Sequence, residues 1–282
     1  MKLISKPRPL AGQTVLITGA SSGMGRALAQ RLSSHGCPVA ILDHNTEGLE
    51  KTAASLSGPV LTRTIDVRDR AALDDFAGAV GEWAPAPLGA VFNNAGVFLA
   101  APFGEQSAAD HDWLMDINLL GVVNGTRAFL PLLTAQGSGA LVNTSSMYGL
   151  AAMEYHTAYC ASKYAVRGFT DALRHELAGT GVRAVNVHPG YVSTAIVDNG
   201  RLQDPFGRSL AEVADEFRAA APTTPERAAE LIHRGVDAGK ARVLVGPDAR
   251  IFDVVTRLTP SHYNTVLGRL ERLMELRGRR RG

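Results

Sequence analysis

Tyr159 and Lys163 are the residues whose types and spacing most directly suggest chemistry in this sequence. They stand four positions apart in a segment that opens a predicted helix, so both side chains project from one side of it and can reach one ligand. A phenol with an ordinary pKa of about 10 is a poor base near neutrality, and lowering that pKa to about 7 requires roughly 4 kcal/mol. A unit positive charge about 4 Å away supplies approximately this energy at an effective dielectric constant near 20. Lys163 can therefore suffice to make Tyr159 a proton acceptor.

A polar segment at residues 143–149 precedes this pair and contains two adjacent serines, Ser145 and Ser146. A serine hydroxyl in such a site can donate a hydrogen bond to an oxygen whose charge changes during the reaction, and it need not be a nucleophile. Pairs of acidic residues and His/Cys clusters at the spacing of metal ligands are absent from the sequence. We therefore expect acid–base chemistry and no metal site.

Three glycines lie at residues 18–25, where a β-branched apolar run ends and a helical pattern begins. Glycine permits a tight turn and lets backbone N–H groups approach a pyrophosphate, whose charge is favoured by the N-terminus of the following helix. A turn without a ligand is the alternative. The residues of this loop predicted to bind a dinucleotide are Gly19, Ser21, Ser22, Gly23, Met24 and Gly25.

Asp43 ends the second predicted strand, 24 residues after the first glycine, which is about where a Rossmann-type fold presents an acid to the adenosine ribose. Its carboxylate can accept hydrogen bonds from the ribose hydroxyls of NAD. The 2′-phosphate of NADP would instead meet a like charge, at a cost of several kcal/mol if desolvated. The pattern therefore favours NAD, although a solvated acid at a strand end is the simpler interpretation of Asp43.

These motifs together resemble the short-chain dehydrogenase/reductase family over roughly residues 10–247. The resemblance rests on the loop Thr-Gly-x-x-x-Gly-x-Gly at 18–25, on Asn-Asn-Ala-Gly at 93–96, and on the serine, tyrosine and lysine above. It selects Ser146 over Ser145, because the family places its active serine at the interval that separates Ser146 from Tyr159. Members that use NADP usually carry Arg or Lys in the glycine loop or after the second strand, where this chain has Ser22 and His44. The resemblance therefore also implies NAD.

The resemblance implies further site residues. Asn118 matches the fourth catalytic residue, which would hold a water that relays the Tyr159 proton to solvent; a polar residue that distorts a core helix is the alternative. Asp66 would bind the adenine amino group, with the Val67 backbone beside it, or would cap the helix that starts near Asp69. The resemblance also implies that Asn94, Ala95 and Gly96 contact the adenine ribose, and that Lys163 and Tyr159 contact the nicotinamide ribose. A loop over the nicotinamide would contain Pro189, Gly190, Val192 and Thr194, although a plain turn is the alternative for this segment.

Residues between Thr194 and Thr223 are expected to form a lid over the substrate. Ser146 is expected to contact the substrate oxygen. The rest of the predicted substrate pocket is apolar and aromatic and consists of Met147, Tyr148, Met153, Tyr155 and Tyr191. Each of these five side chains could equally serve ordinary core or interface packing. We therefore expect an oxidoreductase that moves a hydride between NAD and a hydrophobic secondary alcohol or ketone. An NADPH-dependent carbonyl reductase of the same fold and a non-catalytic nucleotide-sensing or scaffold protein are the alternatives.

Short apolar, β-branched runs alternate with helix-like segments, which predicts an α/β fold. The runs are residues 14–18, 39–42, 60–65, 90–93, 140–144, 183–188 and 242–245. Continuous apolar strands fit a doubly wound, Rossmann-type parallel sheet of about seven strands with helices on both faces. The whole chain, 1–282, is expected to be one domain, with a core at about 10–247 and a C-terminal helical extension at about 248–282. This extension would pack on the domain or on a neighbouring subunit, or contact a membrane interface.

Composition and net charge limit the kinds of partner that we expect for this protein. A formal net charge of +2 gives no reason to expect nucleic acid, and the basic residues 279–281 suit a solvated end or a weak contact with acidic lipid or protein. The two cysteines suit a reducing cytosol, and neither a signal-peptide core nor a bilayer-length apolar run is present. We expect a cytoplasmic protein without stable membrane insertion. The family resemblance implies a homo-oligomer, either a tetramer or a dimer if the extension restricts assembly.

Overall fold

The computed structural model describes residues 9–269. The later part of the predicted C-terminal extension and the basic residues 279–281 lie outside this range. No helix within the described part of the chain combines the length and the apolar character that crossing a membrane requires.

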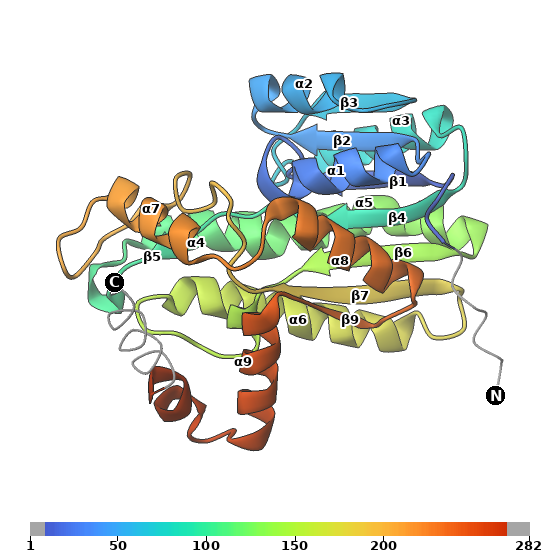
Figure 1. Ribbon diagram of the computed structural model, residues 1–282. Coiled ribbons are helices and arrows are strands. Elements are labelled where there is room, and N and C mark those ends of the chain that lie inside the picture. The colour runs from blue at the N-terminus through green and yellow to red at the C-terminus, as the bar shows by residue number, and fades with distance from the viewer. Residues whose placement is uncertain (1–8, 270–282) are drawn as a thin grey trace.

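The centre of the fold is a seven-stranded parallel sheet with the strand order β3-β2-β1-β4-β6-β7-β9 (Figure 1). The strands are β1 (Thr14–Thr18), β2 (Val39–Asp43), β3 (Val60–Thr64), β4 (Leu88–Asn93), β6 (Gly139–Thr144), β7 (Val182–Pro189) and β9 (Arg242–Val245). All seven predicted strands are present, and their ends differ from the predicted ones by at most two residues. The chain reverses its direction of winding between β1 and β4, as in a doubly wound fold.

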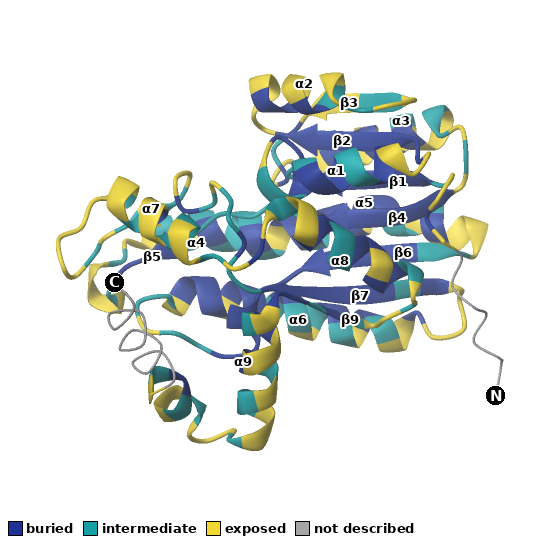
Figure 2. Cartoon of the chain, in the orientation of Figure 1, coloured by how far each residue is buried: buried dark blue, intermediate teal, exposed yellow. Residues whose placement is uncertain are grey.

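Helices cover both faces of this sheet. One face carries α1 (Gly23–Ser34), α2 (Thr46–Ala54) and α8 (Pro225–Asp237), and the other carries α3 (Arg70–Trp83), α5 (Gly121–Gln136) and α6 (Thr157–Glu176). Alternate strand residues enter the two cores: Val15 and Ile17 pack with α1 and α8, whereas Leu16 packs with α3 and α5. Both faces of the central strands are therefore buried (Figure 2), which explains their continuous apolar sequences.

The other elements gather at the carboxyl ends of the strands. They are β5 (Leu99–Ala100), which pairs with β8 (Arg201–Leu202), the short helices η1 (Phe103–Glu105) and η3 (Met147–Gly149), the π-helical turn η2 (Asp116–Leu120), and helices α4 (Ala108–Met115), α7 (Leu210–Ala220) and α9 (Pro247–Leu258). Helix α7 and β8 belong to the predicted lid. Helix α9 belongs to the predicted extension, and its Ala249 and Phe252 pack in one cluster with Tyr148 and Tyr159. The described part of the extension thus packs on the domain, as one of the alternatives predicted.

Candidate active site

The glycine loop and the Asn-Asn-Ala-Gly segment pack directly against each other. A Cβ atom on Gly19, whose φ is 70°, would lie 2.7 Å from the Cα of Ala95, and one on Gly25 would overlap the Gly19 carbonyl oxygen. The Thr18 Oγ1 accepts hydrogen bonds from the backbone N–H groups of Asn94 and Ala95, each at 3.0 Å. Glycine at 19 and 25 is therefore required for space, and the two segments form one floor.

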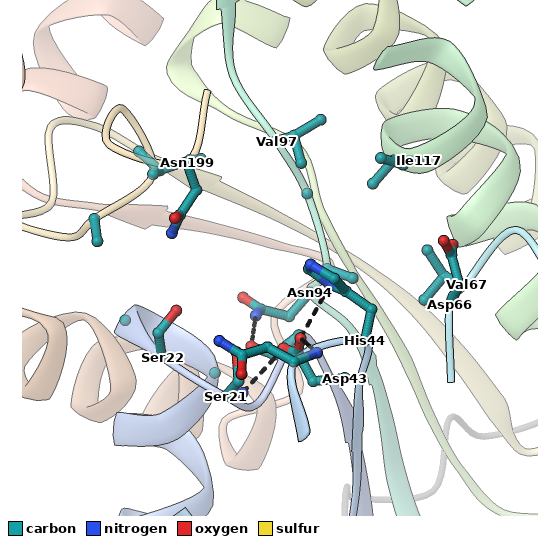
Figure 3. A pocket seen from close by; sticks show the side chains of 18 of the residues that line it. Ser21, Ser22, Asp43, His44, Asp66, Val67, Asn94, Val97, Ile117 and Asn199 are labelled. Carbon is teal, nitrogen blue, oxygen red and sulfur yellow. Dashed lines mark hydrogen bonds and ion pairs between the residues drawn. The ribbon is translucent and has the colours of Figure 1, made fainter. Parts of the chain in front are cut away.

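A cleft of about 430 Å³ opens above this floor at the carboxyl edge of the sheet (Figure 3). Most of the predicted cofactor residues line it: Gly19, Ser21, Ser22, Gly23, Met24, Gly25, Asp43, Asp66, Val67, Asn94, Ala95, Gly96 and Thr194. Pro189, Gly190, Val192, Tyr159 and Lys163 do not line it. His44, which the resemblance singled out as a position that bears on the choice of cofactor, also lines it. So do residues that sequence patterns did not point to, among them Arg68, Val97, Trp113, Ile117 and Asn199.

The N-terminus of α1 faces this cleft and has no side-chain cap. Ser22, at the N-cap, makes no side-chain capping hydrogen bond, and the first turn of α1 contains no acidic residue. The first N–H groups of a helix have no intrahelical acceptor and attract anions. The glycine cradle and this helix end therefore fit the pyrophosphate of a dinucleotide.

Asp43 lies on the cleft side of the second strand and is 7% exposed. Its Oδ2 accepts from the Ser21 N–H at 3.0 Å, its Oδ1 accepts from the Asn45 N–H at 2.9 Å, and the His44 Nδ1 lies 3.1 Å from Oδ1 (Figure 3). Asp43 is thus no solvated strand-end acid, because it fixes the glycine loop. A carboxylate oxygen offers about two acceptor sites, so Oδ2, which has one donor, can still accept from a hydroxyl.

Asp66 does not cap α3, which corrects one of the two roles predicted for it. The N-cap is Asp69, whose side chain accepts from the Ala72 N–H at 3.0 Å. Asp66 instead binds the Arg68 guanidinium with both carboxylate oxygens, and this hydrogen bonding holds the pKa of Asp66 below its ordinary value. A cap must precede the helix directly, and α3 begins at Arg70.

The predicted catalytic residues come together from three elements. Ser146 is the N-cap of η3, where its Oγ accepts from the Tyr148 N–H at 3.1 Å, and Tyr159 and Lys163 are buried in α6. Asn118 is fully buried in the π-helical turn η2, so the helix distortion that was the alternative for this residue is present.

Asn118 joins η2 to the segment that follows β4. Its Oδ1 accepts from the Val97 N–H at 2.8 Å, and its Nδ2 donates to the Val97 carbonyl at 3.0 Å. A Cβ atom on Gly96 would lie 3.1 Å from the Asn118 Oδ1 and 3.3 Å from the Lys163 Nζ. The cluster of Ser146, Tyr159, Lys163 and Asn118 therefore reaches the cleft at Gly96 and Val97, both of which line it.

Burial controls the protonation of this cluster. It raises the pKa of Tyr159 to about 12, against a smaller lowering by a hydrogen bond with the Ser146 side chain, and it lowers the pKa of Lys163 to about 8. The Lys163 Nζ lies 5.6 Å from the centre of the Tyr159 ring and donates to the Thr144 carbonyl at 3.3 Å. In the polypeptide by itself burial is thus the largest influence on both pKa values, and the expectation that Lys163, with help from the charge of oxidised nicotinamide, makes Tyr159 a proton acceptor stays a prediction. Removal from water disfavours the charged form of each group, which raises the pKa of a phenol and lowers that of an amine.

Aromatic rings surround Tyr159. Phe98 and Tyr148 contact its ring at centroid distances of 5.7 and 6.0 Å, and the Tyr148 and Tyr191 hydroxyl oxygens are 2.9 Å apart. Met147 is buried in the same cluster and Met153 packs against it. Tyr155 lies apart from the cluster and contacts Phe206. Rings that no sequence pattern indicated complete the wall, namely Phe98, His156, Phe217 and Phe252.

Comparison with known proteins agrees with this geometry. Residues 13–204 match a family model described as short chain dehydrogenase. A protein named as an oxidoreductase, SadH of Mycobacterium tuberculosis, is 41% identical over 265 residues, which are 91% of this chain and 94% of that protein.

Solved structures are similar as well. A short-chain dehydrogenase/reductase from Burkholderia phymatum in complex with NAD has a TM-score of 0.79 and 28% identity, covering 88% of this chain and 94% of the other. The closed form of a serine dehydrogenase complexed with NADP+ has a TM-score of 0.70 and 29% identity, covering 77% of this chain and 86% of the other.

Proposed function

The chain belongs to the short-chain dehydrogenase/reductase family, and on that premise we propose that it transfers a hydride between NAD(H) and a hydrophobic secondary alcohol or ketone. The observation that carries this proposal is the buried cluster of Ser146, Tyr159, Lys163 and Asn118, which reaches the cleft at Gly96. A family fold alone does not establish catalysis, whereas a cluster of groups that can transfer a proton beside the cleft supports it.

The residues that would hold NAD are those of the cleft. The glycine loop and the α1 N-terminus would bind the pyrophosphate, and Asp43 the adenosine ribose. The one arginine among the cleft-lining residues, Arg68, is engaged by both carboxylate oxygens of Asp66, so it does not offset the repulsion between Asp43 and a 2′-phosphate. This arrangement favours NAD over NADP. When bound, oxidised NAD supplies the acceptor for the hydride and one further positive charge.

The nicotinamide half would be held by residues next to the catalytic cluster. Lys163 would donate to the ribose hydroxyls, close to Gly96. The loop of Pro189, Gly190, Val192 and Thr194 would cover the ring, with Val192 and Thr194 at the carboxamide. Asp66 and Val67 would contact the adenine at the other end of the cleft, which both residues line.

In the oxidation direction, the phenolate oxygen of deprotonated Tyr159 would accept the proton of the substrate hydroxyl as the carbinol carbon gives up its hydride. The Ser146 hydroxyl donates a hydrogen bond to the substrate oxygen while its charge changes. The Lys163 ammonium stabilises the deprotonated Tyr159, and Asn118 holds a water that passes the proton on to solvent. In the reduction direction Tyr159 returns the proton to the oxygen of the product.

The surroundings of Tyr159 support an apolar substrate. Phe98 and Tyr148 contact the Tyr159 ring, and Tyr148 also contacts Phe252. Such walls exclude water and favour large apolar groups next to the reacting carbon. Ser146 and Tyr159 are the polar groups that would fix the substrate oxygen.

The test is a screen of cyclohexanol, indanol and borneol with NAD and with NADP, followed by the absorbance of reduced nicotinamide. We expect turnover of at least one alcohol, faster with NAD by about tenfold or more, as a desolvated like-charge contact predicts. Tyr159→Phe should abolish turnover and keep NADH binding. Tyr164→Phe is the matched control, because Tyr164 lies in the same helix and is 38% exposed. Unchanged turnover by Tyr159→Phe would refute the mechanism.

We also infer that the protein works in the cytosol as a homo-oligomer, a tetramer or a dimer. The family resemblance supports assembly, and the two free, buried cysteines, Cys37 and Cys160, suit a reducing compartment. Light scattering coupled to size-exclusion chromatography tests the assembly, and a monomer at micromolar concentration would contradict it.

A further inference from the structure

We infer that Asp248, in the first turn of α9, is a positioning residue that holds the loop over the nicotinamide. The inference rests on the proposed function, because it takes residues 189–194 as that loop. Neither the sequence patterns nor the resemblance gave Asp248 a role, and the use of the extension that it begins was left open.

Three backbone N–H groups of this loop have acceptors in the C-terminal part of the chain. The Gly190 N–H donates to the Val245 carbonyl at 2.9 Å, and the Ser193 N–H donates to the Thr223 carbonyl at 2.9 Å. Between them, the Tyr191 N–H donates to the Asp248 Oδ2 at 2.5 Å. Only this middle acceptor is a side chain, so it is the one that a substitution can remove.

Two glycines make room for the Asp248 carboxylate. A Cβ atom on Gly190 would overlap all three atoms of the carboxylate group, and one on Gly246 would lie 2.5 Å from its Oδ1. The φ of Gly190 is not in the left-handed region, so glycine at this position serves space and not backbone conformation. The Pro189-Gly190 turn is therefore shaped to the carboxylate.

Helix α9 also fixes the side chain of Tyr191. Phe252, one turn after Asp248, contacts the Tyr148 ring at a centroid distance of 6.4 Å, and the Tyr148 hydroxyl oxygen lies 2.9 Å from that of Tyr191. The backbone of Tyr191 is thus held by Asp248, and its hydroxyl is held by a ring that rests on Phe252. A carboxylate in the first turn of a helix is itself favoured by the helix dipole.

The location of Asp248 predicts which half of the dinucleotide it affects. Strand β9, which α9 follows, lies at the opposite edge of the sheet from β3, whereas Asp43 and the glycine loop follow β2 and β1. Removing the Asp248 carboxylate should therefore loosen the loop over the nicotinamide and leave the adenosine side of the cleft intact.

The experiment compares NADH with ADP-ribose, which lacks the nicotinamide, by isothermal titration calorimetry on the full chain. In Asp248→Ala we expect affinity for NADH to fall by up to about tenfold, because the energy of one hydrogen bond to a charged group sets the upper limit of what the loop can pass on to the ligand, while affinity for ADP-ribose stays within about twofold. Asp248→Asn keeps one acceptor oxygen and should restore NADH affinity to within about threefold of wild type.

The matched control is Asp253→Ala, because Asp253 is on the same helix, pairs with Arg242 and Arg257, and has no contact with the loop. Asp253→Ala should not change the ratio of the affinities for NADH and ADP-ribose. Equal losses of both ligands in Asp248→Ala, or the same change of ratio in Asp253→Ala, would overturn the inference. If Asp248→Ala does not fold, Gly190→Ala offers a second test, because its methyl group displaces the Asp248 carboxylate. This variant must also lose more affinity for NADH than for ADP-ribose. Wild-type protein that binds neither ligand would instead refute the proposed function, and the inference with it.

Discussion

Removing the charge of Lys163 tests the central electrostatic argument. The Lys163 Nζ lies 5.6 Å from the centre of the Tyr159 ring. A unit charge at this distance contributes about 3 kcal/mol at an effective dielectric constant near 20, which corresponds to about 2 pKa units. Methionine has a similar length and no charge. In Lys163→Met the phenolate of Tyr159 therefore loses this stabilisation, and its pKa rises.

The assay is the pH dependence of kcat/KM for oxidation of the best alcohol from the screen with NAD. The rate should rise with pH as Tyr159 loses its proton. With oxidised NAD bound, the positive charge of the nicotinamide adds to that of Lys163, so we expect the rise at a pH where Lys163 is still charged, and in Lys163→Met it should occur about 2 pH units higher. At pH values below the rise, the variant should be about 100-fold slower. Because burial lowers the pKa of Lys163 to about 8, the wild type loses its ammonium as the pH increases past this value, so the difference between the two proteins should shrink there.

A loss of packing or of the hydrogen bond to Thr144 would slow the variant equally at every pH. The pH at which kcat/KM rises, and not the maximum value of kcat/KM, therefore tests the electrostatic role of Lys163. Lys163→Arg keeps the charge and should keep the rise within about half a unit of wild type, as Coulomb's law at a similar distance requires. A rise at the same pH in Lys163→Met and wild type would refute the reasoning.

Three further predictions follow from the geometry. Gly25→Ala places a methyl group against the Gly19 carbonyl and should weaken ADP-ribose binding about 100-fold or more in calorimetry, since neither backbone can yield; binding within threefold of wild type would contradict this. Asp43→Asn removes the charge that would face a 2′-phosphate, so the ratio of the dissociation constants for NADP and NAD should fall about tenfold, and an unchanged ratio would show that the carboxylate does not select the cofactor. Burial lowers the pKa of His188 to about 4, whereas its value in the unfolded chain is about 6.5. The unfolded chain therefore takes up a proton first as the pH falls from about 6.5 toward 4, and the free energy of unfolding decreases by about 3 kcal/mol over this range. His188→Asn keeps a donor for the Ser146 carbonyl without titrating, so its unfolding free energy in urea should fall less between pH 7 and pH 4.5 than that of wild type, and equal slopes would exclude His188 as the cause.

Much of the fold was predictable because its signals are local. Val15, Leu16 and Ile17 form a continuous apolar run because α1 and α8 cover one side of β1 and α3 and α5 cover the other. Thr224 and Pro225 mark the start of α8 because the requirements of a helix N-terminus are met by adjacent residues. The spacing of Tyr159 and Lys163 follows in the same way from the helical repeat.

The two roles proposed for Asp66 show where this reasoning ends. Asp66 was expected either to bind the adenine or to cap the helix that starts near Asp69, and the cap depends on which residue directly precedes the helix once α3 has packed, which is Asp69. Sequence patterns likewise predicted only part of the aromatic wall around Tyr159. Tyr148 and Tyr191 were predicted, but Phe98 and Phe252 carry no motif and reach Tyr159 and Tyr148 only through the fold.

The sequence by itself determined the order of strands and helices along the chain, the glycine loop, and the position of Tyr159 and Lys163 on one side of a helix, because each depends on neighbours within a few positions. The tertiary structure decided the protonation of Tyr159 and Lys163, since burial is the largest influence on both pKa values and no local pattern reports it. It also decided that Asp248 binds the backbone of Tyr191. That contact joins residues far apart in the chain, and it exists only because β7 and β9 lie side by side in the sheet.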